Sequence, residues 1–324
     1  MIKDLKGMGT IAVLMGGCSS ERTISIKSGT AIYEALQGLG CLVVPLDLQS
    51  EREEDVIDLL KKNNTDLVFI ALHGKFGEDG QLQGILERNG IPFTGTGSQA
   101  SQRAMNKIST QDYLSRHGIM TPAYQVFLKG DTLDVKKVVD KVGLPLVVKP
   151  ANEGSSIGIA IIEKIEGLDS AIDMALRYGD QVLLEKYIKG KEITAGILGQ
   201  EALELVEIRP HEKFFDFDAK YKKGLTDYII PAEISVHTGN QIKTCALEAF
   251  RLLDCRDFAR ADFILDDDGL FYFLEMNTIP GFTATSLLPK AAHVAGYDFP
   301  DLCVEILNAA HTRHGPRNKV YKNF

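Results

Sequence analysis

The segment 260–277 constrains the fold more than any other, because two apolar runs in it flank the sequence Asp-Asp-Asp-Gly. A turn of this composition between two apolar runs is a strong signal for a β-hairpin. Side chains alternate between the two faces of a strand. One face of the hairpin is therefore expected to carry a cation and three oxygen ligands: Arg260, Asp262, Glu275 and Asn277.

The register of this hairpin follows from the position of its turn. If Leu265 pairs with Leu270, the two strands run antiparallel from that pair. Counting away from the turn gives two further opposed pairs: Asp262 with Phe273, and Arg260 with Glu275.

The three oxygen ligands suit hard Mg²⁺, which keeps water and substrate phosphate as its remaining ligands. The alternative is a solvent-exposed charged face on an edge hairpin, which is the commoner explanation of carboxylates on strands. The sequence Asn-Thr-Ile-Pro-Gly at 277–281 places a turn where the carboxylates end, and this favours the metal site.

Composition bounds the class of protein. A chain of 324 residues suggests two or three domains, and 44% hydrophobic residues with a mean hydropathy of −0.04 are typical of a globular protein. The formal charge of −8 argues against nucleic acid or an anionic membrane as a partner. No apolar run approaches a membrane span, and the N-terminus lacks a secretory core. The five scattered cysteines indicate reduced thiols, so a cytoplasmic protein is expected.

The first part of the chain alternates short apolar strands with helical patterns as far as a brief strand at 91–93. This alternation predicts a wound parallel sheet, which we assign to an N-terminal domain at 1–97. Ligands of such sheets gather at the carboxyl ends of the strands, here Gly16–Glu21 and His73–Gly80.

Two further units are predicted, at 98–187 and 188–324. The first begins with one helix over 101–117 that carries Lys107. The second contains a polar stretch at 209–231 with little periodicity, and such stretches inside compact domains are usually lids or disordered segments. The tail at 313–324 is expected to be frayed.

Lys149 ends an apolar strand and precedes a Gly/Ser loop at 153–158. Glycines allow close approach of the backbone, so the pair suits a polyphosphate, although the spacing is not that of a Walker loop. A hairpin turn with a lysine beside it explains the residues equally well. The following segment Glu185–Ile188, with Glu192, could present backbone to an adenine and a carboxylate to a ribose. Charged residues at a domain junction are the alternative there.

The loop Gly16–Glu21 lies between a strand and a helix, where free amides favour anions. It lacks Gly-x-Gly-x-x-Gly, which argues against a nicotinamide dehydrogenase. Glu21 could cap the next helix or hold a substrate ammonium group.

Together these motifs resemble the ATP-grasp superfamily and, within it, the D-alanine–D-alanine ligases, over nearly the whole chain. The resemblance rests on an ordered set of segments: 15–22, 72–74, 105–107, 148–150, 153–158, 185–188, 219–221, 260–262, 275–281 and 286–287. The departures are small: Tyr187 where relatives often carry tryptophan, and Met276 and Ile279 where small residues are common.

The resemblance implies a three-domain α/β ATP-grasp fold, in which two α+β domains sandwich ATP beside the wound N-terminal sheet. It implies ATP-dependent joining of two D-alanines through an acyl phosphate, for peptidoglycan precursors, with two Mg²⁺ per site (Mn²⁺ as a substitute) and a homodimer.

The resemblance also implies a role for each matching residue. Those expected to bind ATP are Lys107, Lys149, Ser156, Glu185, Lys186, Tyr187, Ile188, Glu192 and Lys220. The metal ligands are Asp262, Glu275 and Asn277. The catalytic residues are Glu21, Ser155, Tyr221, Arg260 and Gly281, and the substrate-binding residues are Glu21, His73, Ser286 and Leu287. The stretch 209–231 would be a lid.

Two alternatives to D-alanine ligation remain open. One is a ligase of the same fold whose second substrate is D-lactate or D-serine. Tyr221 favours D-alanine over D-lactate, because the resembling D-lactate enzymes commonly lose that tyrosine. The other is a non-catalytic nucleotide-binding module. The presence of Arg260 and the metal ligands argues against it, because a protein that only binds a nucleotide does not need an oxyanion donor.

Overall fold

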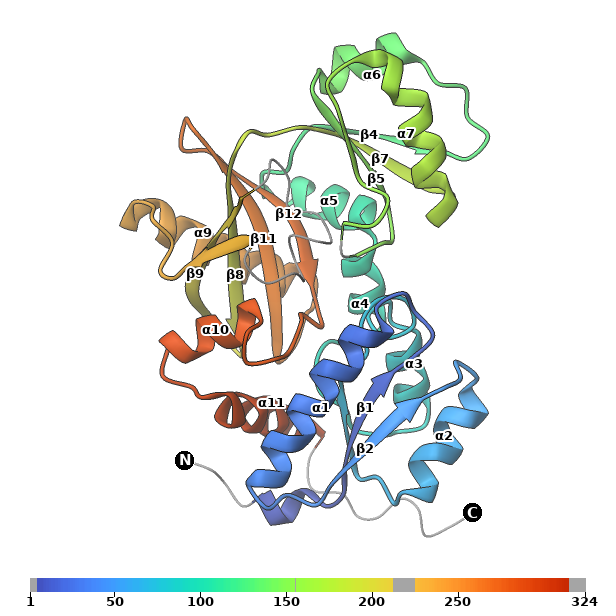
Figure 1. Ribbon diagram of the computed structural model, residues 1–324, viewed down its shortest axis with the longest axis vertical. Coiled ribbons are helices and arrows are strands. Elements are labelled where there is room, and N and C mark those ends of the chain that lie inside the picture. Colours follow the sequence, from blue (N-terminus) through green and yellow to red (C-terminus); the bar gives the residue numbers. More distant parts are fainter. Residues whose placement is uncertain (1–4, 155, 212–224, 315–324) are drawn as a thin grey trace.

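The computed structural model describes residues 5–154, 156–211 and 225–314, and these form three sheets (Figure 1). The predicted lid residues 212–224, Ser155 and the tail 315–324 lie outside the described residues. Short 3₁₀ helices occur at Leu5–Met8, Ile165–Gly167 and Leu176–Tyr178.

The N-terminal sheet is parallel, as predicted, with strand order β2-β1-β3. Its strands are β1 (Ile11–Gly16), β2 (Val43–Leu48) and β3 (Leu67–Ile70), and its helices are α1 (Arg22–Gly38), α2 (Glu53–Lys62) and α3 (Gln81–Arg88). The predicted strand at 91–93 is only a single bridge between Val68 and Phe93. Every residue of β1 is buried, as expected for a central parallel strand covered on both faces.

The helix predicted over 101–117 is two helices, α4 (Ser98–Met105) and α5 (Lys107–Arg116). The prediction of one helix was wrong because Asn106 has an extended backbone, with φ −84° and ψ 104°. Its side chain accepts a hydrogen bond from the Ser109 amide at 2.8 Å, so it caps α5. The break makes Lys107 the first residue of α5.

The central sheet is antiparallel, with strand order β4-β7-β5-β6. It contains β4 (Tyr124–Leu128), β5 (Leu146–Pro150), β6 (Ala160–Ile162) and β7 (Gln181–Lys186). Helices α6 (Val135–Val142) and α7 (Leu168–Ala175) pack on it. Neither β4 nor α6 was expected from the sequence.

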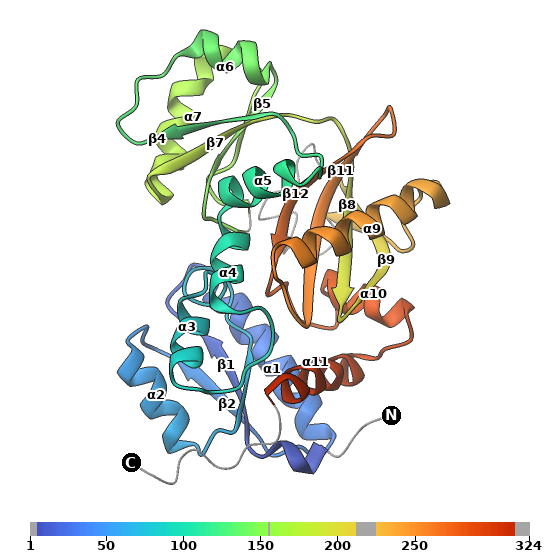
Figure 2. The same ribbon diagram turned by 180° about the vertical axis from the view of Figure 1, so that it is seen from behind.

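The C-terminal sheet is antiparallel, with order β10-β9-β8-β11-β12. Its strands are β8 (Gly190–Leu198), β9 (Glu201–Pro210), β10 (Thr226–Ile229), β11 (Phe258–Asp266) and β12 (Phe271–Asn277). Helix α9 (Val236–Leu252) covers one face (Figure 2), and α10 (Leu287–Val294) and α11 (Phe299–His314) follow the hairpin.

Two predictions about this unit need correction. No strand was predicted within 209–231, but residues Thr226–Ile229 form β10, which pairs with the end of β9. Arg313 is not frayed: it lies in α11 and pairs with Asp257. Strand β10 pairs with the end of the preceding strand β9, whereas Arg313 pairs with a residue 56 positions earlier in the chain.

The N-terminal and C-terminal units share one hydrophobic core, in which β1, β3 and α1 pack with α10 and α11. Phe282 lies within it, with ring centroids 5.8 Å from Phe69, 5.8 Å from Phe258 and 5.4 Å from Phe299. The segment after β12 is thereby fixed against the end of the N-terminal sheet.

A candidate nucleotide and metal site between the sheets

The hairpin register differs from the predicted one. Strands β11 and β12 pair Arg260 with Asn277 and Asp262 with Glu275, and the register shifts between Asp262 and Phe263. The shift leaves Leu274 as an extra, unpaired residue, which is a β-bulge. At the turn the strands are shifted by one residue from the predicted pairing, since Leu265 pairs with Phe271. That shift alone would place Glu275 and Asn277 on the opposite face of the hairpin. The bulge shifts the pairing by a second residue and returns both side chains to the face that carries Asp262. The predicted opposed pairs were therefore wrong, while the shared polar face is present.

Arg260 and Asp262 form a bidentate ion pair on this face. The distances are 2.9 Å from Arg260 Nε to Asp262 Oδ1 and 2.7 Å from Nη2 to Oδ2. The Thr194 hydroxyl on the neighbouring strand β8 donates to Asp262 Oδ1 at 2.5 Å. Both oxygens of Asp262 are thus held in a fixed orientation, by a contact to Thr194 that the sequence analysis did not identify.

Lys107 joins three parts of the molecule at its ammonium group. Its Nζ lies 3.0 Å from Glu275 Oε2 on the hairpin and donates to the Glu153 carbonyl in the Gly/Ser loop at 2.7 Å. The residue is only 6% exposed. The break before α5 therefore aims this lysine between the metal-type carboxylate and the predicted phosphate loop.

Lys149 is equally buried, and its Nζ lies 2.5 Å from Glu185 Oε2. The other oxygen of Glu185 accepts a hydrogen bond from the Gln111 side chain. A buried ammonium group is costly unless it is paired, so Glu185 compensates the charge of Lys149. Glu185 was predicted to bind ATP, yet in this structure its two oxygens face protein donors.

The donor set on the hairpin fits a hard divalent cation. The buried oxygen Oδ1 of Asn277 has no hydrogen-bond partner within 5–154, 156–211 and 225–314. A buried acceptor left without a donor calls for an explanation, and a site for a bound cation is one. Those same residues hold no group of three His, Cys, Asp or Glu side chains suited to a metal. A site here consists of two carboxylates and this amide oxygen.

Glu21 lies where the N-terminal unit meets the phosphate loop. A Cβ atom on Gly74 would lie 2.6 Å from Glu21 Oε2, and one on Gly154 would lie 3.5 Å away. A side chain at position 74 would therefore displace the carboxylate, whereas one at position 154 would make an ordinary van der Waals contact with it. Burial raises the pKa of the Glu153 carboxyl, and the charge of Glu21 acts in the same direction. This accumulation of acidic groups suits a cationic ligand.

His73 is 4% exposed, and both of its ring nitrogens contact protein groups. Nε2 lies 2.9 Å from Ser28 Oγ, while Nδ1 lies 3.1 Å from Glu78 Oε1 and 3.0 Å from the Ile279 carbonyl. Burial acts to lower the pKa of His73, but the hydrogen bond and charge of Glu78 outweigh it, so the pKa is raised. Neither Ser28 nor Glu78 was predicted from the sequence to belong to the site.

The segment after β12 brings Gly281 close to the start of α10. A Cβ atom on Gly281 would lie 3.4 Å from Ser286 Oγ. Ser286 precedes α10 and accepts a hydrogen bond from the Thr283 amide at 3.1 Å, and Leu287 is the first helical residue. The free amides of a helix start favour a carboxylate, which is the role predicted for this pair.

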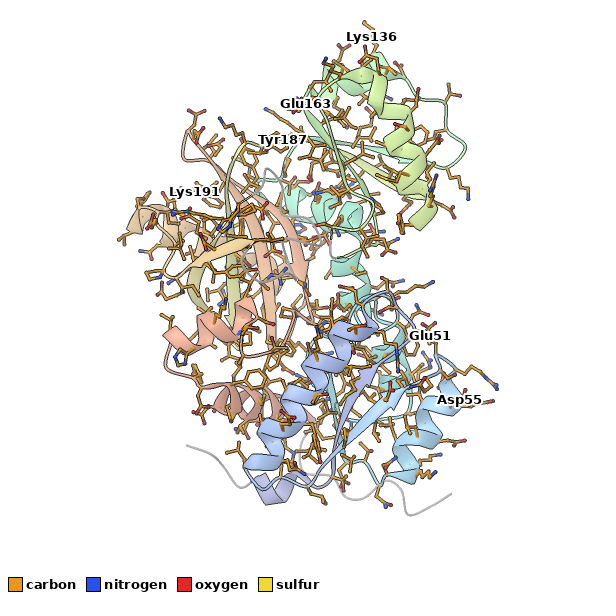
Figure 3. The ribbon with its side chains drawn as sticks, in the orientation of Figure 1. Glu51, Asp55, Lys136, Glu163, Tyr187 and Lys191 are labelled. Carbon is orange, nitrogen blue, oxygen red and sulfur yellow. The ribbon has the colours of Figure 1, made fainter. Side chains whose placement is uncertain are left out.

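The predicted adenine segment crosses from the central to the C-terminal sheet, with Tyr187 at the junction (Figure 3). Lys186 ends β7 and is exposed, whereas Tyr187 and Ile188 are half-buried. Glu192 lies on β8, paired with Ile264, and Ser156 has a φ of 59° in the phosphate loop. Ser155, Lys220 and Tyr221 lie outside the described residues.

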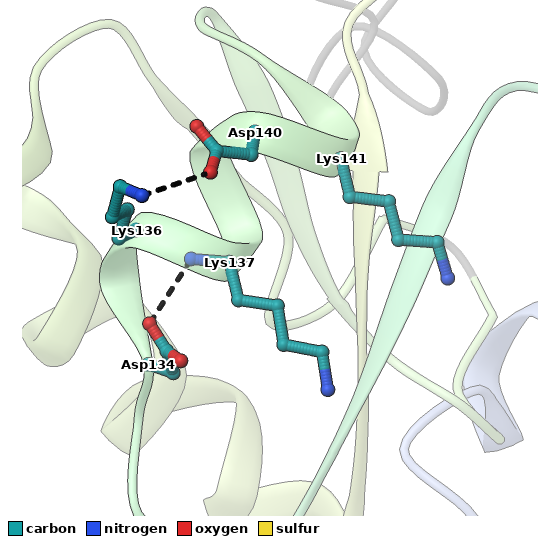
Figure 4. Close-up of a pocket in the computed structure, with 5 residues that line it drawn as sticks. All are labelled: Asp134, Lys136, Lys137, Asp140 and Lys141. Atoms are coloured by element: carbon teal, nitrogen blue, oxygen red, sulfur yellow. Dashed lines mark hydrogen bonds and ion pairs between the residues drawn. The ribbon is translucent and has the colours of Figure 1, made fainter.

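A surface depression on α6 is unrelated to this site. It is lined by Asp134, Lys136, Lys137, Asp140 and Lys141, with an exposed ion pair between Lys136 and Asp140 (Figure 4). Helix α6 lies at the outer end of the central unit in Figure 1, away from β12. Its charges form a solvated helix face.

The fold has three sheets, a lysine at the junction of helix, loop and hairpin, and two carboxylates on one face of that hairpin. These features define an ATP-grasp ligase. The sequence comparisons agree. Residues 113–308 match the model for the D-ala D-ala ligase C-terminus, and residues 49–96 match that for the N-terminus. The D-alanine–D-alanine ligase of Pelotomaculum thermopropionicum is 42% identical over 318 residues, covering 95% of this chain and 99% of that protein.

Solved structures show the same relationship. The D-alanine–D-alanine ligase of Bacillus anthracis, crystallised with ATP, has a TM-score of 0.83 at 33% identity, covering 94% of this chain and 98% of that chain. The VanG D-Ala:D-Ser ligase of Enterococcus faecalis has a TM-score of 0.79 at 28% identity, covering 93% and 99%. The chain belongs to the D-alanine–D-alanine ligase family, and it is an ADP-forming ligase.

Proposed function

We propose that this protein joins two D-alanines at the expense of ATP, with the chemistry centred on Lys107. The observation that carries the proposal is the ammonium group of Lys107, which contacts both Glu275 and the Glu153 carbonyl. A buried cation at the junction of the carboxylate hairpin and a Gly/Ser loop is placed to receive a triphosphate.

The reaction proceeds in two steps. A carboxylate oxygen of the first D-alanine attacks the γ-phosphorus, and the bond to the β-phosphate breaks to release ADP. The amine of the second D-alanine then attacks the carbonyl carbon of the acyl phosphate. The amine loses a proton, the carbonyl re-forms and inorganic phosphate leaves. Most of the demand on the protein is positioning and charge compensation.

Lys107 and Lys149 would bind the phosphates of ATP. Each lysine is paired with a carboxylate in this structure, Glu275 and Glu185 respectively. Phosphate oxygens would take over part of this pairing and keep the buried charges compensated. The segment Lys186–Ile188 with Glu192 would contact the adenosine, and Ser156 and Lys220 would contact the phosphates.

Asp262, Glu275 and Asn277 would hold Mg²⁺, and the unpaired Oδ1 of Asn277 supports this assignment. A bound Mg²⁺ neutralises negative charge on the phosphates. The contact from Thr194 orients Asp262, so the carboxylate has a defined direction before any ion binds.

The substrates and the oxyanion have their own groups. Arg260, held by Asp262, and the Gly281 amide would stabilise the oxygen that becomes negative during the second step. Glu21 would bind the ammonium of the first D-alanine, supported by the acidic surroundings described above. Ser286 and the Leu287 amide would bind the carboxylate of the second, and Ser155 with Tyr221 would complete the site.

The likeness to a D-Ala:D-Ser ligase favours one alternative, in which D-serine is the second substrate. Phosphate release and product analysis with D-alanine, L-alanine, D-lactate and D-serine decide between them. We expect ATP hydrolysis and dipeptide formation with D-alanine alone, and little product with L-alanine or D-lactate. D-Alanyl-D-serine as the main product of an equal mixture would establish the alternative.

The metal assignment is tested with Glu275→Gln, which removes one charged ligand and keeps the side-chain size. Turnover should fall at least about tenfold, with a higher Mg²⁺ requirement, because a charge-assisted contact is worth about 1.5–3 kcal/mol. Near-normal turnover at ordinary Mg²⁺ concentrations would show that Glu275 is not a metal ligand.

Several finer assignments belong to this proposal. The domains are taken as 1–97, 98–187 and 188–324, with residues 209–231 as a lid over the site. The protein is taken to be a cytoplasmic homodimer in a pathway for peptidoglycan precursors. No helix in residues 5–154, 156–211 and 225–314 is long and apolar enough to cross a membrane.

A further inference from the structure

The turn 279–282, which carries Gly281, is held from outside by two side chains of the N-terminal unit. The Phe282 amide donates to Ser28 Oγ at 3.2 Å, and the Ile279 carbonyl lies 3.0 Å from His73 Nδ1. Ser28 lies on α1 with 0% exposure. One buried hydroxyl and one buried imidazole therefore hold the two ends of the turn.

The two holding groups are also joined to each other. His73 Nδ1 faces two acceptors, Ile279 O and Glu78 Oε1, so this nitrogen carries the hydrogen. In the neutral ring Nε2 is then an acceptor, 2.9 Å from Ser28 Oγ. The Ser28 hydroxyl can donate to Nε2 while its oxygen accepts from the Phe282 amide. Every group in this chain of hydrogen bonds has a partner, so the arrangement defines one geometry for the turn.

The turn depends on this external support because of its own sequence. Pro280 has no N–H group and cannot donate a hydrogen bond within the turn. The side chains of Ile279 and Phe282 are 4% and 2% exposed, so they anchor the turn in the core but leave the direction of its amides to hydrogen bonds. An oxyanion donor must be aimed within a few tenths of an ångström to be effective.

We propose that Ser28 and His73 are positioning residues for the Gly281 amide, and that neither touches the reacting atoms. The inference deepens the proposed function, on which it rests for the role of Gly281. His73 acts through the turn, since both of its ring nitrogens are engaged by protein groups. The N-terminal unit thereby orients the Gly281 amide toward the oxyanion, in addition to binding the first substrate.

The test is Ser28→Ala, which deletes one oxygen atom from a buried site. Removing an oxyanion donor costs about 10²–10³ in kcat, and misdirecting one should cost less. We expect kcat to fall about tenfold, while the KM for ATP changes less than about twofold because the lysines are untouched. Hydrogen exchange of the Phe282 amide in the ligand-free protein should accelerate about tenfold.

Ser101→Ala is the matched control. Ser101 is also 0% exposed, and its hydroxyl donates to the Thr96 carbonyl at 3.3 Å, a hydrogen bond that does not involve the turn. We expect this variant to lose a similar buried hydrogen bond but to keep the wild-type kcat and the wild-type exchange rate at Phe282. An equal loss of kcat in both variants would mean that general destabilisation is responsible and would overturn the proposal.

Two further outcomes are decisive. A Ser28→Ala protein with wild-type kcat, or with unchanged exchange at Phe282, would overturn the inference while the ligase activity of the wild type stands. If the wild type makes no dipeptide, the proposed function fails, and the exchange measurement still decides whether Ser28 holds the turn. Should Ser28→Ala not fold, His73→Asn replaces it: this variant keeps a donor near the position of Nδ1 and loses the contact that orients the Ser28 hydroxyl. A lower kcat with an unchanged KM for ATP is then expected, and a wild-type kcat would overturn the inference.

Discussion

At the scale of single residues, the site is dominated by two lysines that are almost completely buried. Lys107 and Lys149 are each 6% exposed and each contacts one carboxylate. The cost of removing an ammonium group from water is several kcal/mol, so the paired carboxylates are needed for the protein to fold with its lysines in place. The same carboxylates compensate the charges of the two lysines before ATP binds.

Lys149→Met tests this pairing. It leaves Glu185 buried without its counter-ion, so the free energy of unfolding should fall by about 3 kcal/mol, measured with urea. The double variant Lys149→Met with Glu185→Gln should regain most of this stability, because Gln111 can still hydrogen-bond to residue 185. Turnover should stay low in both variants. Recovery of ATP turnover in the double variant would show that Lys149 has only a structural role.

The cysteines give a second prediction at this scale. Burial raises the pKa of Cys245 to about 11 and that of Cys255 to about 12, and it also raises the pKa of Cys41 and Cys303. Cys18 is exposed. Because the thiolate is the reactive form, one thiol should react rapidly with an aromatic disulfide reagent at pH 8 in the native protein. All five thiols should react after denaturation. Rapid reaction of two or more thiols in the native protein would contradict the effect of burial on the other four cysteines.

At the scale of elements, the break between α4 and α5 determines where Lys107 points. Both helices pack against the hairpin strand β12 and the core beneath it. A continuous helix would carry residue 107 within a helix rather than at its first position. Asn106 makes the break locally, since its side chain caps α5.

Asn106→Ala should cost about 1 kcal/mol of unfolding free energy, which is typical for an N-cap, and should also weaken ATP binding through displacement of Lys107. Asp134→Ala is the matched control, because Asp134 caps α6 by accepting from the Lys137 amide at 3.0 Å (Figure 4). That variant should lose similar stability and bind ATP normally. Equal ATP affinity in the two variants would show that the break between α4 and α5 does not determine the position of Lys107.

At the scale of the whole molecule, the N-terminal and C-terminal units are joined by a polar contact as well as by their shared core. The Asp257 carboxylate accepts from the Gly95 amide and pairs with Arg313, and Arg313 Nη2 donates to the Phe93 carbonyl at 2.8 Å. Asp257 has a φ of 62°, which a non-glycine residue adopts rarely and at some cost. The contact fixes α11 against the N-terminal sheet.

Arg313→Ala should lower the free energy of unfolding by about 2–3 kcal/mol, because Asp257 remains largely buried without its partner. Arg313→Lys should recover only part of this, since an ammonium group cannot contact Asp257 and Phe93 in a forked geometry. Arg116→Ala, which removes an exposed pair with Asp112, is the control and should leave stability nearly unchanged. Comparable losses in Arg313→Ala and Arg116→Ala, measured by urea unfolding, would contradict a contact between the units.

The sequence by itself determined those features that depend on neighbours in the chain. Alternation along a strand placed Arg260, Asp262, Glu275 and Asn277 on one face, and alternating strands and helices predicted the parallel N-terminal sheet. The fold class and the ligase family also followed, because the ordered motifs extend over nearly the whole chain. A local pattern carries this information since the period of a strand or helix is set by its own backbone.

Only the tertiary structure decided which side chains meet. The hairpin register differs from the predicted one both at the turn, where Leu265 pairs with Phe271, and at the bulge at Leu274, and Phe273 and Met276 beside the bulge pack in the core. The partners Lys149 and Glu185 are 36 residues apart, and Ser28 and Phe282 are 254 apart. No local pattern encodes such pairs, since burial and hydrogen-bond geometry arise when distant elements pack. The charged residues of the site could be predicted from the sequence, whereas the pairing of each cation with its carboxylate, and supports such as Thr194 and Ser28, could not.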